Sequence, residues 1–224
     1  MKVTTDGCLF GAWIAERLRN SSSGTCKLLD IGTGTGLLSM MLSQENNIIV
    51  DAVEIDKDAF EQATENVAAS RWNDSIHVIH ADAMNFESGN KYDIIISNPP
   101  FYEKELKSAD TRKNLAHHNN GLLLPGLLSI IKKNLKPHGS FYLLLPYKRN
   151  EEVKNMFVEN ELAMQQLTFV RQSVRHDYFR MLLEGKLKTY ESAETMIDEI
   201  SIKDDNDLYT PDFINLLKEY YLYL

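Results

Sequence analysis

The predicted fold is decided by one stretch, Tyr92-Asp93-Ile94-Ile95-Ile96-Ser97-Asn98-Pro99-Pro100-Phe101. Its three successive isoleucines predict a strand that is buried on both faces of a sheet. The two prolines end this strand, because neither has an N–H to donate and each fixes φ. A residue before proline is held extended, so Asn98 presents its amide at a rigid bend, the proline corner (Asn98–Phe101). The amide, the unused carbonyl oxygens and the ring of Phe101 suit a planar amine, although prolines also punctuate ordinary strand ends.

Helical patterns separate this strand from other apolar runs along the chain. The runs that predict strands are 26–31, 48–55, 76–80, 140–145, 162–170 and 178–187. Strands that alternate with helices indicate a parallel sheet covered on both faces. The last two runs have no helix between them and predict a hairpin. We therefore expect an α/β, doubly wound, mostly parallel seven-stranded sheet with helices on both faces and a terminal antiparallel strand.

Length and composition indicate a single domain over residues 1–224. We expect an N-terminal helix within residues 1–24, and an acidic tail with a C-terminal helix at 189–224. Hydrophobic residues make up 43% and charged residues 25% of the chain, enough for a sizeable core. No apolar run reaches the ~20 residues that span a membrane, and no signal peptide pattern opens the chain. We expect a cytoplasmic monomer.

Cysteine and histidine usage argues against a metal site. The two cysteines, Cys8 and Cys26, lie far apart and show no ligand spacing. The pair His117-His118 has no accompanying H-x-x-x-H or C-x-x-C pattern. We expect no metal and a reducing compartment.

The net charge of −8 would at first disfavour a nucleic-acid partner. Residues 189–224 hold nine acidic residues against two lysines, however, so the rest of the chain is nearly neutral. An acidic tail can conceal a local basic footprint elsewhere. The candidate RNA-binding residues are Lys104, Lys107, Arg112 and Lys113 after the proline corner, and Arg171, Arg175 and Arg180 on the predicted hairpin.

A glycine-rich loop, Gly32-Thr33-Gly34-Thr35-Gly36, follows the first predicted strand. Glycines between a strand and a helix let the backbone turn sharply and approach a ligand. Dinucleotide folds require glycine at the next position of this pattern, where the chain has Leu37, which disfavours a nicotinamide cofactor. Taken alone, the loop is equally consistent with plain turn chemistry.

Polar side chains also end the next three strands. Glu54 lies 20 residues beyond Gly34, where a carboxylate can accept hydrogen bonds from both hydroxyls of a ribose. Asp82 ends the third strand and Asn98 the fourth. A single acidic residue at a strand end is explained by solvent exposure alone, because strands end at the surface. Four such groups in register predict a common binding crevice at the carboxyl edge of the sheet.

These motifs resemble a known enzyme family. The segments Asp30–Gly36, Glu54, Ala81-Asp82-Ala83 and Asn98–Phe101 are similar to those of class I S-adenosylmethionine-dependent methyltransferases that modify amino nitrogens, in which the last motif reads NPPF or NPPY. More narrowly, segments 2–7, 9–13 and 213–221 resemble the bacterial tRNA(Val) adenosine(37) N(6)-methyltransferases. The resemblance spans nearly the whole chain.

The resemblance implies S-adenosyl-L-methionine as cofactor, tRNA as substrate and a role for each motif. The glycines would lie under the methionine part, Glu54 would hold the ribose, and Asp82 would accept a bond from the adenine amine. The full implied cofactor set is Thr5, Asp6, Gly7, Asp30, Gly32, Gly34, Gly36, Glu54, Ile55, Asp82, Ala83 and Asn98. The implied catalytic set, which holds the substrate amine and stacks on its base, is Asn98, Pro99, Pro100 and Phe101.

Several alternatives stay open on the sequence. The proline corner fits amine methyltransferases of ribosomal RNA, of DNA or of a protein glutamine equally well. A nucleotide-binding module without catalysis would use the corner only as scaffold. A dehydrogenase is disfavoured by Leu37.

Overall fold

The computed structural model describes residues 3–19, 24–44, 47–99, 122–189 and 194–224. One eight-stranded sheet in the order β3-β2-β1-β4-β5-β7-β6-β8 forms its centre. The strands are β1 (Cys26–Ile31), β2 (Ile48–Glu54), β3 (Ile76–His80), β4 (Tyr92–Ser97), β5 (Leu135–Pro146), β6 (Leu162–Ser173), β7 (Tyr178–Leu187) and β8 (Met196–Lys203). The helices are α1 (Thr5–Leu18), α2 (Leu37–Leu42), α3 (Lys57–Ala68), α4 (Leu124–Asn134), α5 (Asn150–Glu159) and α6 (Pro211–Leu217).

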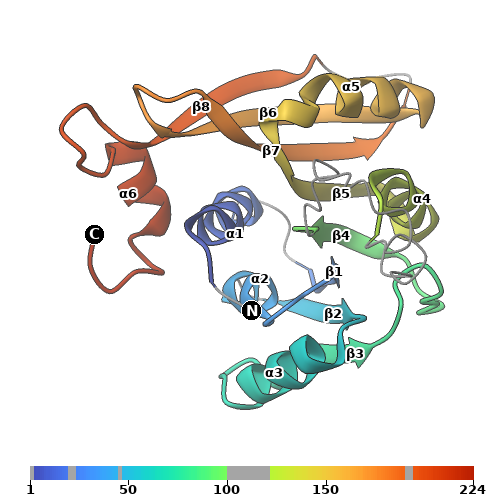
Figure 1. Cartoon of the computed structure of the whole chain (residues 1–224). Coiled ribbons are helices and arrows are strands. Elements are labelled where there is room, and N and C mark those ends of the chain that lie inside the picture. The colour runs from blue at the N-terminus through green and yellow to red at the C-terminus, as the bar shows by residue number, and fades with distance from the viewer. Residues whose placement is uncertain (1–2, 20–23, 45–46, 100–121, 190–193) are drawn as a thin grey trace, which may run out of the picture.

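Helices cover both faces of this sheet, as the unbroken isoleucine run requires. Figure 1 shows α1 and α2 on one side of the sheet and α4 and α5 on the other. In β4, Ile94 and Ile96 pack into the core under α1, α2 and α6. Ile95 points the opposite way, into the core under α4 and α5. Successive side chains of a strand alternate between faces, so a strand apolar at every position is buried on both.

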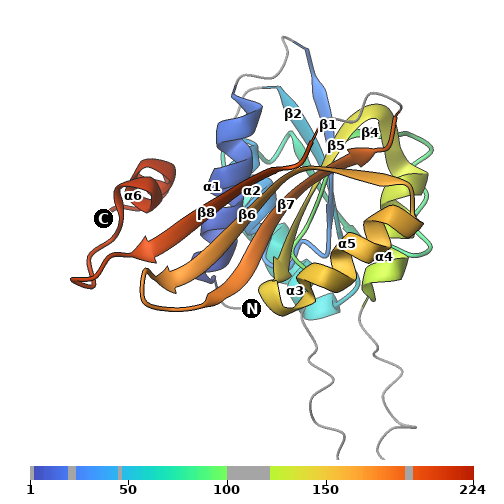
Figure 2. The same ribbon diagram turned by 90° about the horizontal axis from the view of Figure 1, so that it is seen from above.

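The doubly wound, mostly parallel prediction is confirmed, with differences at one edge. Strands β1 to β5 pair in parallel, and β7 is antiparallel to both β5 and β6. The antiparallel strand therefore lies between two parallel neighbours instead of at the edge of the sheet. Figure 2 shows β6, β7 and β8 as long strands lying side by side.

The prediction of seven strands was wrong, because part of the acidic tail forms β8. This strand pairs in parallel with β6 and extends the sheet by one. Only Ile200 and Ile202 are buried in it, at alternate positions, while Asp198 and Glu199 are exposed. The many acidic residues around this short alternation conceal the strand pattern.

The C-terminal helix of the tail agrees with the sequence. Thr210 caps α6 by accepting a hydrogen bond from the Phe213 N–H at 3.3 Å, and Pro211 occupies the first turn. The fully buried Phe213 stacks on Tyr209 with ring centroids 4.8 Å apart. The helix α6 packs against the N-terminal helix α1.

Candidate functional site

The carboxyl ends of β1, β2, β3 and β4 lie within one or two residues of each other along the sheet. Ile31 pairs with both Val53 and Ser97, and Glu54 pairs with His80. The Ser97 hydroxyl donates to the Ile31 carbonyl at 2.8 Å and fixes β4 against β1. The glycine loop and the Glu54, Asp82 and Asn98 positions therefore share one edge, as the sequence predicts.

Glu54 joins the glycine loop to the end of β2. The residue is 6% exposed, and its carboxylate accepts the Gly34 N–H at 2.8 Å and the Asp56 N–H at 2.9 Å. Each carboxylate oxygen has two lone pairs, so these bonds leave acceptor capacity on both. The Glu54 carboxylate is thus already fixed in orientation at the edge of the sheet.

Asp30 lies under the same loop and is fully buried. Its Oδ2 accepts hydrogen bonds from the hydroxyls of Thr33 and Ser39, both at 2.7 Å. Burial raises the pKa of Asp30 to about 6, and the two hydroxyl donors partly oppose this rise. Its Oδ1 is buried and has no hydrogen-bond partner among the described residues.

The loop backbone leaves room for a ligand. Gly32 has φ of +73°, a conformation that L side chains rarely adopt. A Cβ placed on Gly32 would meet no heavy atom within 4 Å, so this side of the loop faces open space. Asn66 of α3 donates to the Thr35 carbonyl at 2.9 Å and holds the loop against that helix.

Asp82 forms a local turn at the end of β3. Its two oxygens accept the Met84 N–H at 2.9 Å and the Asn85 side-chain amide at 3.0 Å. Ile55, which directly follows β2, is 64% exposed. An exposed aliphatic side chain and an oriented carboxylate at neighbouring strand ends suit a planar ring with an exocyclic amine.

Asn98 lies at the end of β4 beside the start of α1. A Cβ placed on Gly7 would lie 3.8 Å from Asn98 Nδ2 and 4.0 Å from Leu37 Cδ2. The side chain of Asn98 makes no hydrogen bond to any residue described, and Pro99 is buried. Gly7, one of the three residues of the predicted N-terminal wall, therefore lies close to Asn98 of the proline corner and to Leu37, the first residue after the glycine loop.

Part of the predicted site lies outside the described residues. Pro100 and Phe101 of the corner belong to this part, as do Lys104, Lys107, Arg112 and Lys113. The other three predicted RNA-binding residues are paired with carboxylates. Arg171 contacts Glu199 at 2.7 Å, Arg175 contacts Asp205 at 2.9 Å, and Arg180 contacts Asp6 at 2.8 Å. Their binding of RNA stays a prediction.

Comparison with known proteins assigns the family. Residues 12–163 match the family model described as "Methyltransferase small domain". The tRNA1(Val) (adenine(37)-N6)-methyltransferase of Flavobacterium johnsoniae is 36% identical over 99% of this chain and 93% of its own. The chain belongs to this methyltransferase family.

Solved structures outside the immediate family share the methyltransferase fold. A crystal structure from Agrobacterium tumefaciens, described as a predicted O-methyltransferase, has a TM-score of 0.69 at 14% identity and covers 94% of both chains. A glycopeptide N-methyltransferase crystallised with S-adenosyl-L-homocysteine has a TM-score of 0.59 at 16% identity and covers 81% of this chain and 90% of its own. At such identities the likeness extends to the fold alone.

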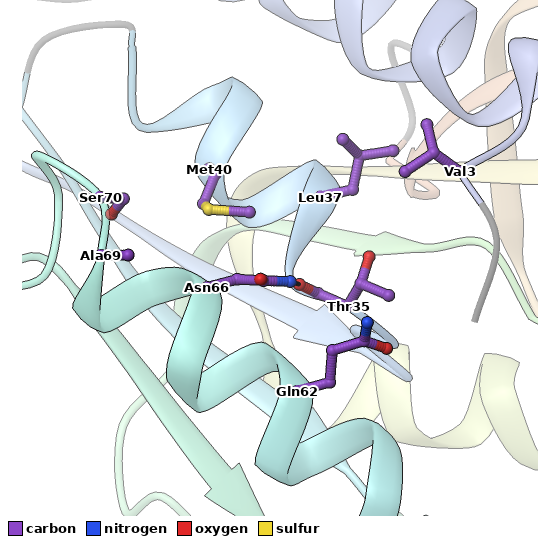
Figure 3. Close-up of a pocket in the computed structure, with 8 residues that line it drawn as sticks. All are labelled: Val3, Thr35, Leu37, Met40, Gln62, Asn66, Ala69 and Ser70. Carbon is purple, nitrogen blue, oxygen red and sulfur yellow. Dashed lines mark hydrogen bonds between the residues drawn. The ribbon is translucent and has the colours of Figure 1, made fainter.

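A separate cavity of about 410 Å³ lies behind the glycine loop of this methyltransferase. Figure 3 shows Gln62 and Asn66 of α3 facing Thr35, with Val3 lying next to Leu37. None of Glu54, Asp82 or Asn98 lines it. The cavity shares Thr35 with the glycine loop but is lined by none of the predicted cofactor-binding or catalytic residues.

Sequence reasoning missed the residues that support the site. Thr33 and Ser39 hold Asp30, and Asn66 holds the loop from a helix more than thirty positions away. Thr33 lies inside the recognised motif and could have been included. The roles of Ser39 and Asn66 depend on how the helices pack, for which no short motif gives a signal.

Two further absences concern only the part of the chain that the structure describes. There, no group of three or more histidine, cysteine or acidic side chains could hold a metal ion. In the same ranges, no helix is both long and apolar enough to cross a membrane.

Proposed function

We propose that this methyltransferase transfers a methyl group from S-adenosylmethionine to the exocyclic amine of an adenine in tRNA. By the name of its relatives, the target is adenine 37 of tRNA(Val). One observation carries the proposal: Asn98 of the proline corner and Leu37, which follows the loop that would hold the cofactor, both lie close to Gly7. An amine held at the corner would lie at the open edge of the glycine loop.

The residues at the carboxyl edge fit this cofactor. The open side of Gly32 admits a ligand close to the backbone, and Asp30 Oδ1 is a buried acceptor that keeps its hydrogen-bonding capacity. Glu54 is oriented to accept ribose hydroxyls, while Asp82 and Ile55 bind the adenine edge and face. S-adenosylmethionine supplies a methyl group that the positive charge on its sulfur activates.

Asn98 and Pro99 act on the acceptor nitrogen. The lone pair of an exocyclic adenine amine is conjugated with the ring, which makes it a poor nucleophile. Asn98 Oδ1 and the Pro99 carbonyl accept the two N–H groups and draw the nitrogen towards tetrahedral geometry, so that its lone pair is localised. The nitrogen lone pair forms a bond to the methyl carbon as the bond from that carbon to sulfur breaks, which would leave S-adenosylhomocysteine, and the nitrogen then releases one proton to solvent.

Positioning supplies much of the rate enhancement in this scheme. Holding two reactants in a near-attack geometry replaces a bimolecular encounter, and this contributes up to ~7–11 kcal/mol in the best intramolecular cases. The methylated nitrogen is cationic before it loses its proton, so no strong base is needed before transfer. No histidine has a catalytic role in the proposal.

The predicted RNA surface consists of Lys104, Lys107, Arg112, Lys113, Arg171, Arg175 and Arg180. Lysines and arginines that contact phosphates release counterions, so tRNA affinity should fall steeply with salt. Arg171 and Arg175 would have to exchange Glu199 and Asp205 for phosphates. Both ion pairs are partly exposed, and such pairs are worth only about 0–1 kcal/mol.

The proposal is tested with methyl-labelled cofactor and separate pools of unmodified tRNA, ribosomal RNA, DNA and protein. Label in the tRNA pool alone is the expected result. Label only in ribosomal RNA, DNA or protein would establish one of the other amine methyltransferases in its place. Cofactor binding with no transfer to any pool would indicate a non-catalytic nucleotide-binding module.

A further inference from the structure

An ion pair joins the start of α1 to strand β7 of the sheet. Arg180 of β7 contacts Asp6 of α1 with Nε 2.8 Å from Oδ2, although 174 positions separate the two residues. The Asp6 side chain is 17% exposed and the Arg180 side chain 27%. Partly buried charges are screened less by solvent than exposed ones, so this pair is a stronger restraint than a surface pair.

The same carboxylate also orients the backbone at Gly7. Asp6 Oδ1 accepts the Gly7 N–H at 3.1 Å while Oδ2 faces Arg180. The Thr4 hydroxyl accepts the same N–H at 3.3 Å and caps the helix. Gly7 in turn lies against Asn98 and Leu37. The ion pair therefore fixes the backbone that separates the proline corner from the glycine loop.

We propose that Arg180 is a positioning residue for the cofactor site, which it serves by holding Asp6 and the Gly7 backbone in place. This role rests on the proposed function, since it concerns the binding of S-adenosylmethionine at the carboxyl edge. Arg180 differs in this respect from Arg171 and Arg175, which form ion pairs with Glu199 and Asp205 of the C-terminal segment. The sequence groups all three arginines as phosphate contacts, and the structure separates Arg180 from the other two.

The two roles predict different measurements for Arg180→Met. A positioning residue weakens cofactor binding when it is lost, and Asp6→Asn should do the same. A phosphate contact weakens tRNA binding and flattens its salt dependence by about one unit of slope. In that case Asp6→Asn should leave tRNA binding unchanged or strengthen it, because it removes a competing carboxylate.

The test is a double-mutant cycle with Asp6→Asn, Arg180→Met and the combined variant, read by calorimetric titration with S-adenosylmethionine. Each single variant should lose about tenfold in affinity, which corresponds to ~1.4 kcal/mol. The combined variant should lose no more than either single one, because residues that act as a unit are not additive. Arg180→Lys keeps a cation near Asp6 and should restore part of the affinity.

A second readout needs no cofactor. Amide hydrogen exchange at Gly7 and Cys8 should quicken in both single variants, because the restraint on this backbone is lost. Arg19→Met is the matched control, since Arg19 pairs with Glu219 at 2.7 Å at the opposite end of the same helix. It should leave both the exchange at Gly7 and the cofactor affinity unchanged.

Two results would overturn the inference, and they are distinguishable. If the unaltered chain binds S-adenosylmethionine and the variants bind it equally well, Arg180 has no positioning role. This conclusion does not depend on whether the proposed function is correct. If the unaltered chain does not bind S-adenosylmethionine at all, the proposed function fails and the role of Arg180 fails with it.

Discussion

Replacing Glu54 by glutamine tests how the cofactor site is built. The glutamine keeps the size of the side chain but has one acceptor oxygen instead of two. In the structure the carboxylate accepts two backbone N–H groups, from Gly34 and Asp56. One of these backbone N–H groups would face the NH₂ group of glutamine and lose its acceptor. The loss would occur at a buried position, because residue 54 is only 6% exposed.

The size of the effect follows from these contacts. A hydrogen bond to a charged group is worth about 1.5–3 kcal/mol. In a domain of this size each kcal/mol shifts the melting temperature by ~2–4 °C, so we expect a fall of ~3–12 °C. The lower end is favoured, because the charge of Glu54 also raises the pKa of Asp30 and its removal relieves that buried carboxyl. Cofactor affinity should fall about tenfold or more, since two ribose hydroxyls lose a charged acceptor.

Thermal unfolding and calorimetric titration measure the two effects on one preparation. The matched control is Glu61→Gln on α3, where the exposed carboxylate pairs with Lys57 at 3.5 Å. It should change the unfolding free energy by less than about 0.5 kcal/mol and leave cofactor affinity intact. If Glu54→Gln has the same melting temperature and the same cofactor affinity as this control, Glu54 neither stabilises the glycine loop nor binds the ribose.

Three further predictions concern the strand ends and the core. Because burial raises the pKa of Asp30 to about 6 from its usual 3.8, the unfolded chain loses this proton at a lower pH than the folded one. The unaltered chain should therefore lose ~2 kcal/mol of stability relative to Asp30→Asn as pH rises from about 4 to about 6, and denaturant titrations that show a constant difference would refute this. Asn98→Ala should abolish methyl transfer with cofactor affinity nearly intact, and substantial turnover by the purified variant would exclude the proposed role. Gly185→Ala should lower the melting temperature because its Cβ would clash with the Phe141 ring, whereas Gly24→Ala has nothing within 4 Å and should not.

The central part of the sheet could be predicted because its signals are local. Isoleucines 94–96 require two covering layers, and the loop at Gly32 and Gly34 marks the turn from β1 to α2. The strand β8 could not be predicted in this way. Its two buried isoleucines lie among acidic residues, and what stabilises it is the otherwise unpaired edge of β6, a partner about thirty positions away.

The candidate site, like the sheet, has a part that could be predicted from the sequence and a part that could not. Residues at or just after strand ends, such as Glu54 and Asn98, share an edge because parallel strands end together, and the sequence shows where each strand ends. The partner of Arg180 could not be predicted, since a cluster of arginines on a predicted hairpin gives no sign of which carboxylate lies opposite. That pairing depends on how α1 lies across the sheet, which is a property of the packed core.

The central claim is that the methyl group is added to the exocyclic nitrogen of adenine, and identification of the methylated nucleoside tests it most directly. Unmodified tRNA is incubated with the protein and S-adenosylmethionine, digested near neutral pH so that methyl groups do not rearrange, and analysed by chromatography and mass spectrometry. Because Asn98 and Pro99 are proposed to bind an amine, we expect N6-methyladenosine from the unaltered protein and no methylated nucleoside from Asn98→Ala. Recovery of 1-methyladenosine or 2-methyladenosine from the unaltered protein would place the methyl on a ring atom and contradict the account.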